Sequence, residues 1–156
     1  MSAYEGNGRV DPARRASVAE ALRAVLSSDS VLDAEESVAP YECDGLNLEQ
    51  QSPLLVALPR DEREVAAVLR TCHALGVPVV ARGAGTGLSG GAQPLADGVV
   101  ISTARLNRIL KLDAYARTAV VQPGVRNLAI SEAAAPHGLY YAPDPSSQLA
   151  CTIGGN

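Results

Sequence analysis

Residues 77–91 read Val-Pro-Val-Val-Ala-Arg-Gly-Ala-Gly-Thr-Gly-Leu-Ser-Gly-Gly, and this stretch decides the fold of the chain. The first five residues form an apolar run of the kind that makes a buried strand. Half of the next ten residues, from Arg82 to Gly91, are glycine. Glycine accepts positive φ and has no Cβ, so such a loop can turn several backbone N–H groups toward one point. A concave array of N–H donors suits an anionic phosphate group, and the sequence therefore predicts a phosphate-binding loop after the strand.

Three kinds of phosphate-binding glycine loop compete for this segment. A Walker A loop needs a lysine after its last glycine, but Gly91 stands at that position. A dinucleotide fingerprint is formally present from Gly85 to Gly90, yet it must open a long helix. The residues that follow, 91–94, read Gly-Ala-Gln-Pro and cannot begin one. A loop that holds a diphosphate with its own amides fits best. A flexible linker is the remaining alternative, although linkers rarely follow a β-branched strand.

The residues before the loop predict a strand, a helix and a second strand. Leu54–Leu58 is a short apolar strand, and Asp61 with Glu64 can cap the helix after it. Gly76 ends that helix, whose apolar face comprises Val65, Val68, Leu69 and Cys72. This order predicts a βαβ unit with parallel strands. The glycine loop then lies at the carboxyl end of the second strand, where ligands of open α/β sheets bind.

Further elements are expected on both sides of this unit. The first ten residues are expected to be disordered, and a helix begins either at Ser17, with a capping box to Glu20, or earlier at Asp11-Pro12. Residues 27–52 are polar and are expected to form an irregular connecting arm. Downstream, strands are expected at 98–102, 109–112 and 119–121, the last two joined by a hairpin turn at 113–117. Asn127 is expected to cap a helix that runs through Ala135. We divide the chain into an N-terminal helix with connecting arm (1–52) and a cofactor-binding domain (53–156).

Composition excludes several classes of function. The 156 residues are 47% hydrophobic and 19% charged, which is typical of a soluble globular protein. A net charge of −4 and the lack of a Lys/Arg-rich run argue against nucleic-acid binding. Three widely spaced cysteines make a disulfide framework unlikely and favour the cytoplasm. No apolar run reaches the length of a membrane span, and residues 1–15 lack the apolar core of a secretory signal.

The glycine loop resembles the pyrophosphate loop of the PCMH-type FAD domain, found in flavoenzymes of the vanillyl-alcohol-oxidase superfamily. Four other segments are similar to the FAD-binding subunits of bacterial glycolate oxidases, in the branch that includes D-lactate dehydrogenases: residues 41–45, 121–127, 138–147 and 151–156. The resemblance implies an α+β PCMH-type domain, whose first subdomain contains the βαβ unit and a mixed sheet. In relatives the chain continues into a second subdomain and a cap domain, so we expect this sequence to be an N-terminal part.

The resemblance also implies which residues bind FAD. The loop would bind the diphosphate through its amides, with hydroxyl donors from Thr86 and Ser89. The full set of implied cofactor-binding residues is Arg82, Gly83, Ala84, Gly85, Thr86, Gly87, Leu88, Ser89, Gly90, Gly91, Pro123, Gly124, Pro143, Asp144, Ser146, Ser147, Thr152, Ile153, Gly154, Gly155 and Asn156. Some relatives attach the flavin through a histidine in the loop. This loop has none, so non-covalent FAD is expected.

Several of these residues have a second interpretation. Arg82 is either a helper to the phosphate or a structural partner of a nearby acid. Without the glycine loop, residues 143–147 would be an ordinary Pro/Ser turn cluster. Cys151 either abuts the flavin or is a small buried thiol. His73 and His137 are expected to be structural, and no metal site is expected.

The implied function is that of an FAD-dependent 2-hydroxy-acid dehydrogenase, which oxidises glycolate or D-lactate to the 2-oxo acid. Electrons would leave through partner subunits, including an iron–sulfur protein, and those partners would attach the cytoplasmic enzyme to the inner membrane. The catalytic residues are expected beyond residue 156. Two alternatives stay open: an FAD-linked oxidase with another substrate, and a non-catalytic nucleotide-binding module.

Overall fold

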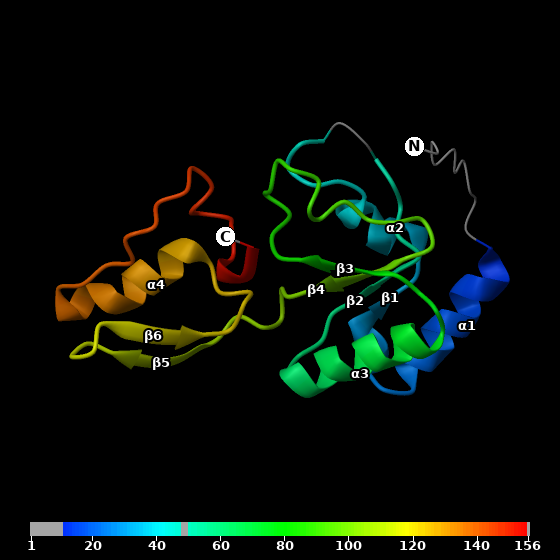
Figure 1. The fold of residues 1–156 in the computed structure, drawn as a ribbon, viewed down its shortest axis with the longest axis horizontal. Helices are drawn as coiled ribbons and strands as arrows, with labels where there is room; N and C mark the ends of the chain where they lie inside the picture. The colour runs from blue at the N-terminus through cyan, green and yellow to red at the C-terminus, as the bar shows by residue number, and fades with distance from the viewer. Residues whose placement is uncertain (1–10, 48–49, 156) are drawn as a thin grey trace.

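The computed structural model describes residues 11–47 and 50–155, so the prediction for the first ten residues lies outside the described part. Figure 1 shows two halves side by side: a four-stranded sheet with helices on both faces, and a hairpin with one helix. We call them the sheet half and the hairpin half. The C-terminal turn lies between the two halves.

The sheet half is built on four strands in the order β1-β2-β4-β3. They are β1 (Val31–Leu32), β2 (Leu55–Ala57), β3 (Val79–Arg82) and β4 (Val99–Ser102). Strand β4 pairs in parallel with β2 and with β3, whereas β1 pairs with β2 in antiparallel fashion. The predicted parallel βαβ unit is therefore confirmed, with β4 inserted between its two strands. Every residue of β2 and β4 is buried, as central strands covered on both faces should be.

Helices α1 and α3 cover one face of this sheet, and the short helix α2 covers the other (Figure 1). Helix α3 (Glu62–Ala74) is capped by the Asp61 carboxylate, which accepts the Glu64 N–H at 2.9 Å, as predicted. Helix α1 (Pro12–Arg23) starts at the earlier of the two expected sites, because the Asp11 carboxylate accepts the N–H of Ala13. The core under these two helices contains Leu22, Leu55, Val68, Cys72 and Val99. Burial raises the pKa of the Cys72 thiol.

The expectation of an irregular arm was wrong for residues 28–41. This segment contains a 3₁₀ turn (Ser28–Ser30), strand β1, helix α2 (Glu35–Val38) and a second 3₁₀ turn (Ala39–Tyr41). Val38 is fully buried against Val56 and Val100, on the face of the sheet opposite to α1. A two-residue strand and a four-residue helix are too short to show a hydrophobic period.

The hairpin half contains β5 (Ile109–Asp113), β6 (Thr118–Val121) and α4 (Asn127–Ala134). The two strands pair in antiparallel fashion, as predicted. A 3₁₀ turn (Ala135–His137) and the left-handed Gly138 end the helix. The expected cap by Asn127 was wrong, since Arg126 occupies the capping position without a side-chain bond. The backbone N–H of Asn127 instead donates to the Cys151 carbonyl at 3.1 Å, which ties the helix start to the C-terminal segment.

Candidate functional site

The glycine loop leaves β3 at its carboxyl end with most of its amides unused. The Gly90 N–H donates to Asp44 Oδ2 at 2.8 Å. For the amides of residues 83–89, no acceptor occurs within the described part of the protein. Glycines 85 and 90 take positive φ values of 72° and 74°, which allow the sharp folding of the loop. The loop therefore presents a set of free donors, as a phosphate-binding loop requires.

A cavity of about 400 Å³ lies against this loop, within the size range of small-molecule sites. Its walls are the loop together with a second segment near the C-terminus. Among the described residues, Arg82 is the one charged member of the lining, and none of them contributes a carboxylate; the lining comprises Ala81, Arg82, Gly83, Ala84, Gly85, Thr86, Gly87, Ser89, Gly91, Ala92, Thr103, Cys151, Thr152, Gly154 and Gly155. The chemistry of this lining favours an anionic ligand.

The second wall is held in place by backbone contacts. The 3₁₀ turn η4 (Ile153–Gly155) docks on the loop before α4, where the Gly154 N–H donates to the Pro123 carbonyl at 2.9 Å. The N–H of Gly124 donates in turn to the Leu106 carbonyl at 2.7 Å, close to the end of β4. Pro123 and Gly124 thus lie beside the C-terminal turn, and their role as cofactor ligands stays a prediction. A neighbouring cavity of about 440 Å³ contains Gly124 and shares Gly83, Ala84 and Thr152 with the first.

Thr152 stands where the two walls meet. Its Oγ1 atom is buried and has no hydrogen-bond partner in the described structure. A Cβ on Gly83 would collide with that same oxygen, so only glycine fits opposite the hydroxyl. Next to Gly87 and Gly91, in contrast, an added Cβ would meet open space. An unpaired hydroxyl, unused amides and room beside the glycines fit the diphosphate of a dinucleotide such as FAD.

Arg82 makes contacts that were left open by the sequence. Its guanidinium donates to the Cys43 carbonyl at 2.7 Å and lies over the Tyr41 ring, 5.6 Å from the ring centroid. It is 8% exposed, and a Cβ on Gly85 would collide with it. Arg82 thus fastens the loop to residues 41–43, through a carbonyl and a ring rather than an acid. Its role as a cofactor ligand stays a prediction.

The structure does not bring all the predicted residues to the cavity. Pro143, Asp144 and Ser146 are exposed, and neither they nor Ser147 belong to its lining. The Leu88 side chain is exposed. Ile153 is not part of the lining, and its N–H donates to the Val125 carbonyl. Asn156 lies outside the described residues. Cys151 is buried and lines the cavity, so its two interpretations stay open.

Sequence reasoning missed the contribution of the segment behind the loop. We call residues 41–46 the support segment, since Tyr41, Cys43 and Asp44 all contact the glycine loop or its first arginine. Asp44 is 6% exposed, and its second oxygen accepts the Leu46 N–H at 2.9 Å. A buried carboxylate in a polar arm could not be distinguished from an exposed one in the sequence. The only local signal was the Asp44-Gly45 pair, which indicates a turn.

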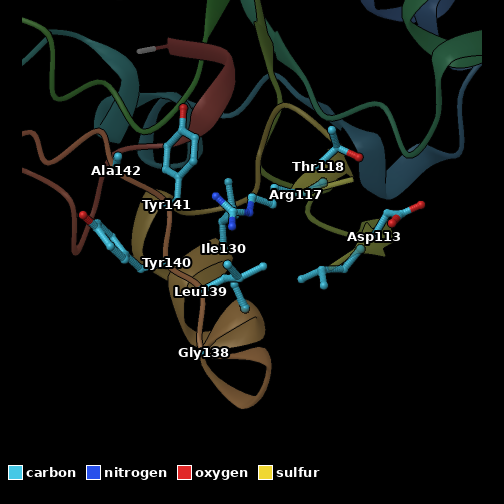
Figure 2. A pocket seen from close by; sticks show the side chains of 12 residues that line it. Asp113, Arg117, Thr118, Ile130, Gly138, Leu139, Tyr140, Tyr141 and Ala142 are labelled. Atoms are coloured by element: carbon cyan, nitrogen blue, oxygen red, sulfur yellow. The ribbon is translucent and has the colours of Figure 1, made fainter. Parts of the chain in front are cut away.

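A third cavity, of about 330 Å³, lies in the hairpin half between β5, β6, α4 and residues 138–142. Figure 2 shows that side chains form its walls, with Leu139 beside Ile130 and with Tyr140 and Tyr141 pointing in different directions. The Tyr141 N–H donates to the Ser131 hydroxyl at 3.0 Å, which holds this segment on α4. This cavity differs in kind from the glycine cavity, because side chains rather than backbone amides dominate it.

None of the helices within residues 11–47 and 50–155 combines the length and the apolarity that a membrane crossing needs. Over the same residues, His, Cys, Asp and Glu side chains nowhere gather in threes around a position for a metal ion.

Comparisons with known proteins agree with this geometry. The family described as "FAD binding domain" matches residues 53–156. Glycolate oxidase subunit GlcD of Escherichia coli K12 is 56% identical over 150 residues, which are 96% of this chain and 30% of that protein. D-lactate dehydrogenase of Archaeoglobus fulgidus is 41% identical over 101 residues, 65% of this chain and 22% of that protein. The chain therefore spans less than a third of the length of these relatives.

Solved structures share the fold. Alkyldihydroxyacetonephosphate synthase superposes with a TM-score of 0.79 at 22% identity, over 90% of this chain and 28% of that one. p-Cresol methylhydroxylase superposes with a TM-score of 0.72 at 23% identity, over 83% of this chain and 26% of that one. At this level of identity the likeness shows the fold alone, and it confirms the predicted α+β PCMH-type domain.

Proposed function

We propose, because this chain belongs to the FAD binding domain family, that it is the cofactor-binding part of a flavin-dependent 2-hydroxy-acid dehydrogenase. The relatives support the substrate class. Their names include glycolate oxidase, D-lactate dehydrogenase and D-2-hydroxyglutarate dehydrogenase, and all three substrates carry a hydroxyl next to a carboxylate. The observation that carries the proposal is the set of unused loop amides facing a cavity without carboxylates.

The residues of the glycine loop would bind the diphosphate of FAD. Hydrogen bonds to a charged group contribute about 1.5–3 kcal/mol each, so three or four amides between Gly83 and Ser89 suffice for firm binding. The orphaned Thr152 hydroxyl would add a donor from the second wall. FAD supplies a two-electron acceptor for the oxidation. With no histidine in the loop, the flavin is held without a covalent bond.

The overall reaction removes two electrons and two protons from the substrate. At its second carbon the C–H and O–H bonds would break to leave a 2-oxo group; FAD held by the glycine loop would supply the acceptor for the hydride equivalent, and the hydroxyl proton would pass to a base. Electrons then leave to partner subunits, in agreement with the word "subunit" in the names of the glycolate oxidase relatives. We extend the proposal to an iron–sulfur partner and to a cytoplasmic enzyme attached to the inner membrane through its partners.

The first test is the flavin itself. The purified protein should be yellow, and acid should release the flavin. Gly87→Val should remove FAD while the melting temperature stays close to that of wild type, because the new side chain meets no protein atom and fills the cavity. Ala119→Val, on exposed β6 and outside that cavity, is the matched control and should retain FAD.

Four outcomes test the proposal and separate the candidate functions. A colourless wild-type protein that takes up no FAD would contradict the proposal and favour a nucleotide-binding module. Full FAD content in Gly87→Val would contradict the binding site. If flavin is bound, anaerobic loss of its colour with glycolate, D-lactate or D-2-hydroxyglutarate identifies the substrate. An unchanged colour with all three favours an FAD-linked oxidase of another specificity.

A further inference from the structure

The support segment contacts the glycine loop from the side opposite to the cavity. Ser89 and Gly91 line the cavity, whereas Gly90 between them does not. The Gly90 N–H points instead to Asp44 Oδ2, at 2.8 Å. None of residues 41–46 contributes to the cavity lining. Asp44 therefore binds the loop on the side away from the cavity, and the two neighbours of Gly90, which are Ser89 and Gly91, stay on the cavity side.

Gly45 fixes the direction of two peptide groups in the same loop. A Cβ on Gly45 would lie 2.8 Å from the Thr86 carbonyl oxygen and 3.0 Å from that of Gly87, so both carbonyls reach the support segment. The described chain has no cis peptide bond. In a trans peptide the N–H points opposite to the C=O. The N–H groups of Gly87 and Leu88 must then point away from the support segment, and of these two residues Gly87 lines the cavity.

We propose that Asp44 and Gly45 are positioning residues for the cofactor: they hold the back of the glycine loop so that the Gly87 amide faces the diphosphate. The inference rests on the proposed function, since it concerns the same site. Asp44 suits this task because its two oxygens accept two N–H groups, those of Leu46 and Gly90. An asparagine could accept only one of them, and its NH₂ group would then face a donor.

Both residues are tested by calorimetric titration of the apoprotein with FAD and with inorganic pyrophosphate. Asp44→Asn should weaken the binding of FAD and of pyrophosphate by the same factor, roughly tenfold, because both ligands bind the loop amides that the substitution leaves less well ordered. Asp97→Asn removes the same charge from an exposed position between the loop and β4, and it should leave both affinities unchanged. Gly45→Ala, which adds no charge, should reproduce the loss.

A second readout separates positioning from a general loss of stability. In wild-type protein, pyrophosphate should shift the amide NMR signal of Gly87, and in Asp44→Asn and Gly45→Ala this shift should shrink at saturating ligand. Wild-type affinities or wild-type shifts in both variants would overturn the inference while the proposed function stands. If wild-type protein binds neither FAD nor pyrophosphate, the proposed function itself fails.

Discussion

The sheet half and the hairpin half differ most in how their strands are buried. Every residue of β2 and β4 is buried, whereas no residue of β5 or β6 is. One valine from each half shows the contrast: Val100 in β4 is 0% exposed, and Val120 in β6 is 53% exposed. The glycine loop thus leaves an edge strand, β3, which is paired along its length with the buried strand β4. The segments of the opposite wall, at 123–124 and 152–155, are joined to a two-stranded hairpin, which by itself is only marginally stable.

This difference shows that the two walls of the glycine cavity contribute differently to ligand binding. The loop must hold several amides in fixed directions, and it is braced by the sheet on one side and by the support segment on the other. The second wall supplies fewer groups, chiefly the Thr152 hydroxyl and the turn at Ile153–Gly155. Its position depends on backbone bonds to Pro123 and Val125 rather than on a shared core.

The largest expected effect comes from the same substitution made in each half. Val100→Ala removes two methyl groups from a packed core and should lower the free energy of unfolding by about 2 kcal/mol. Val120→Ala trims an exposed side chain and should change it by less than about 0.5 kcal/mol. Chemical denaturation followed by circular dichroism measures both. Equal losses in the two variants would show that the β6 surface is packed as firmly as the sheet.

Thr152→Val sharpens the comparison at the point where the walls meet. Removing an unpaired buried hydroxyl should leave the apoprotein as stable as wild type or more stable, by up to about 1 kcal/mol. FAD binding should weaken several-fold, because the variant loses a donor to the diphosphate. Thr118→Val on exposed β6 is the matched control and should change neither quantity. Unchanged FAD affinity in Thr152→Val would exclude the hydroxyl as a ligand.

The sheet half was the more predictable half, for physical reasons. Strands β2 and β3 and helix α3 follow from apolar runs, the Asp61 cap and Gly76, which are all local signals. The insertion of β4 between β2 and β3 is not local, and the sequence carries no pattern for it. Strand β1 escaped prediction because its place depends on pairing with β2, not on its own two residues.

The candidate site shows the same limit. The glycine loop could be predicted because its residues fix its conformation, and Gly124 and Thr152 were found through resemblance. The structural role of Asp44 could not be predicted, since its partner Gly90 is 46 residues away. Residues 143–147 have Pro and Ser in a turn-forming pattern, and the described structure leaves them outside the glycine cavity. Their role as cofactor ligands stays a prediction.

The smallest expected effect concerns one surface aspartate in each half. In the sheet half, the pKa of Asp29 is lowered, chiefly by the hydrogen bond from the Ser27 side chain, with Arg60 and Arg105 adding to it. In the hairpin half, the pKa of Asp113 is lowered, chiefly by the backbone N–H of Ala116. A lowered pKa in the folded state means that each carboxylate stabilises the protein above its unfolded pKa. That contribution disappears as the pH falls through the folded pKa, below the ordinary 3.8.

Asp29→Asn and Asp113→Asn should therefore lower the melting temperature slightly at neutral pH, and the gap to wild type should close as the pH falls below 3.8. Asp29 should matter more, because it joins Arg60 before α3 to Arg105 after β4, at 2.7 and 3.2 Å. The partners of Asp113 lie within its own hairpin, namely the Ala116 N–H at 2.9 Å and Lys111 Nζ at 3.4 Å. Melting curves over this pH range measure both gaps. A larger gap for Asp113→Asn would mean that the hairpin half depends on the bond in its turn more than the sheet half depends on the ion pairs of Asp29. A gap that persists in acid would mean that the carboxylate charge is not its cause.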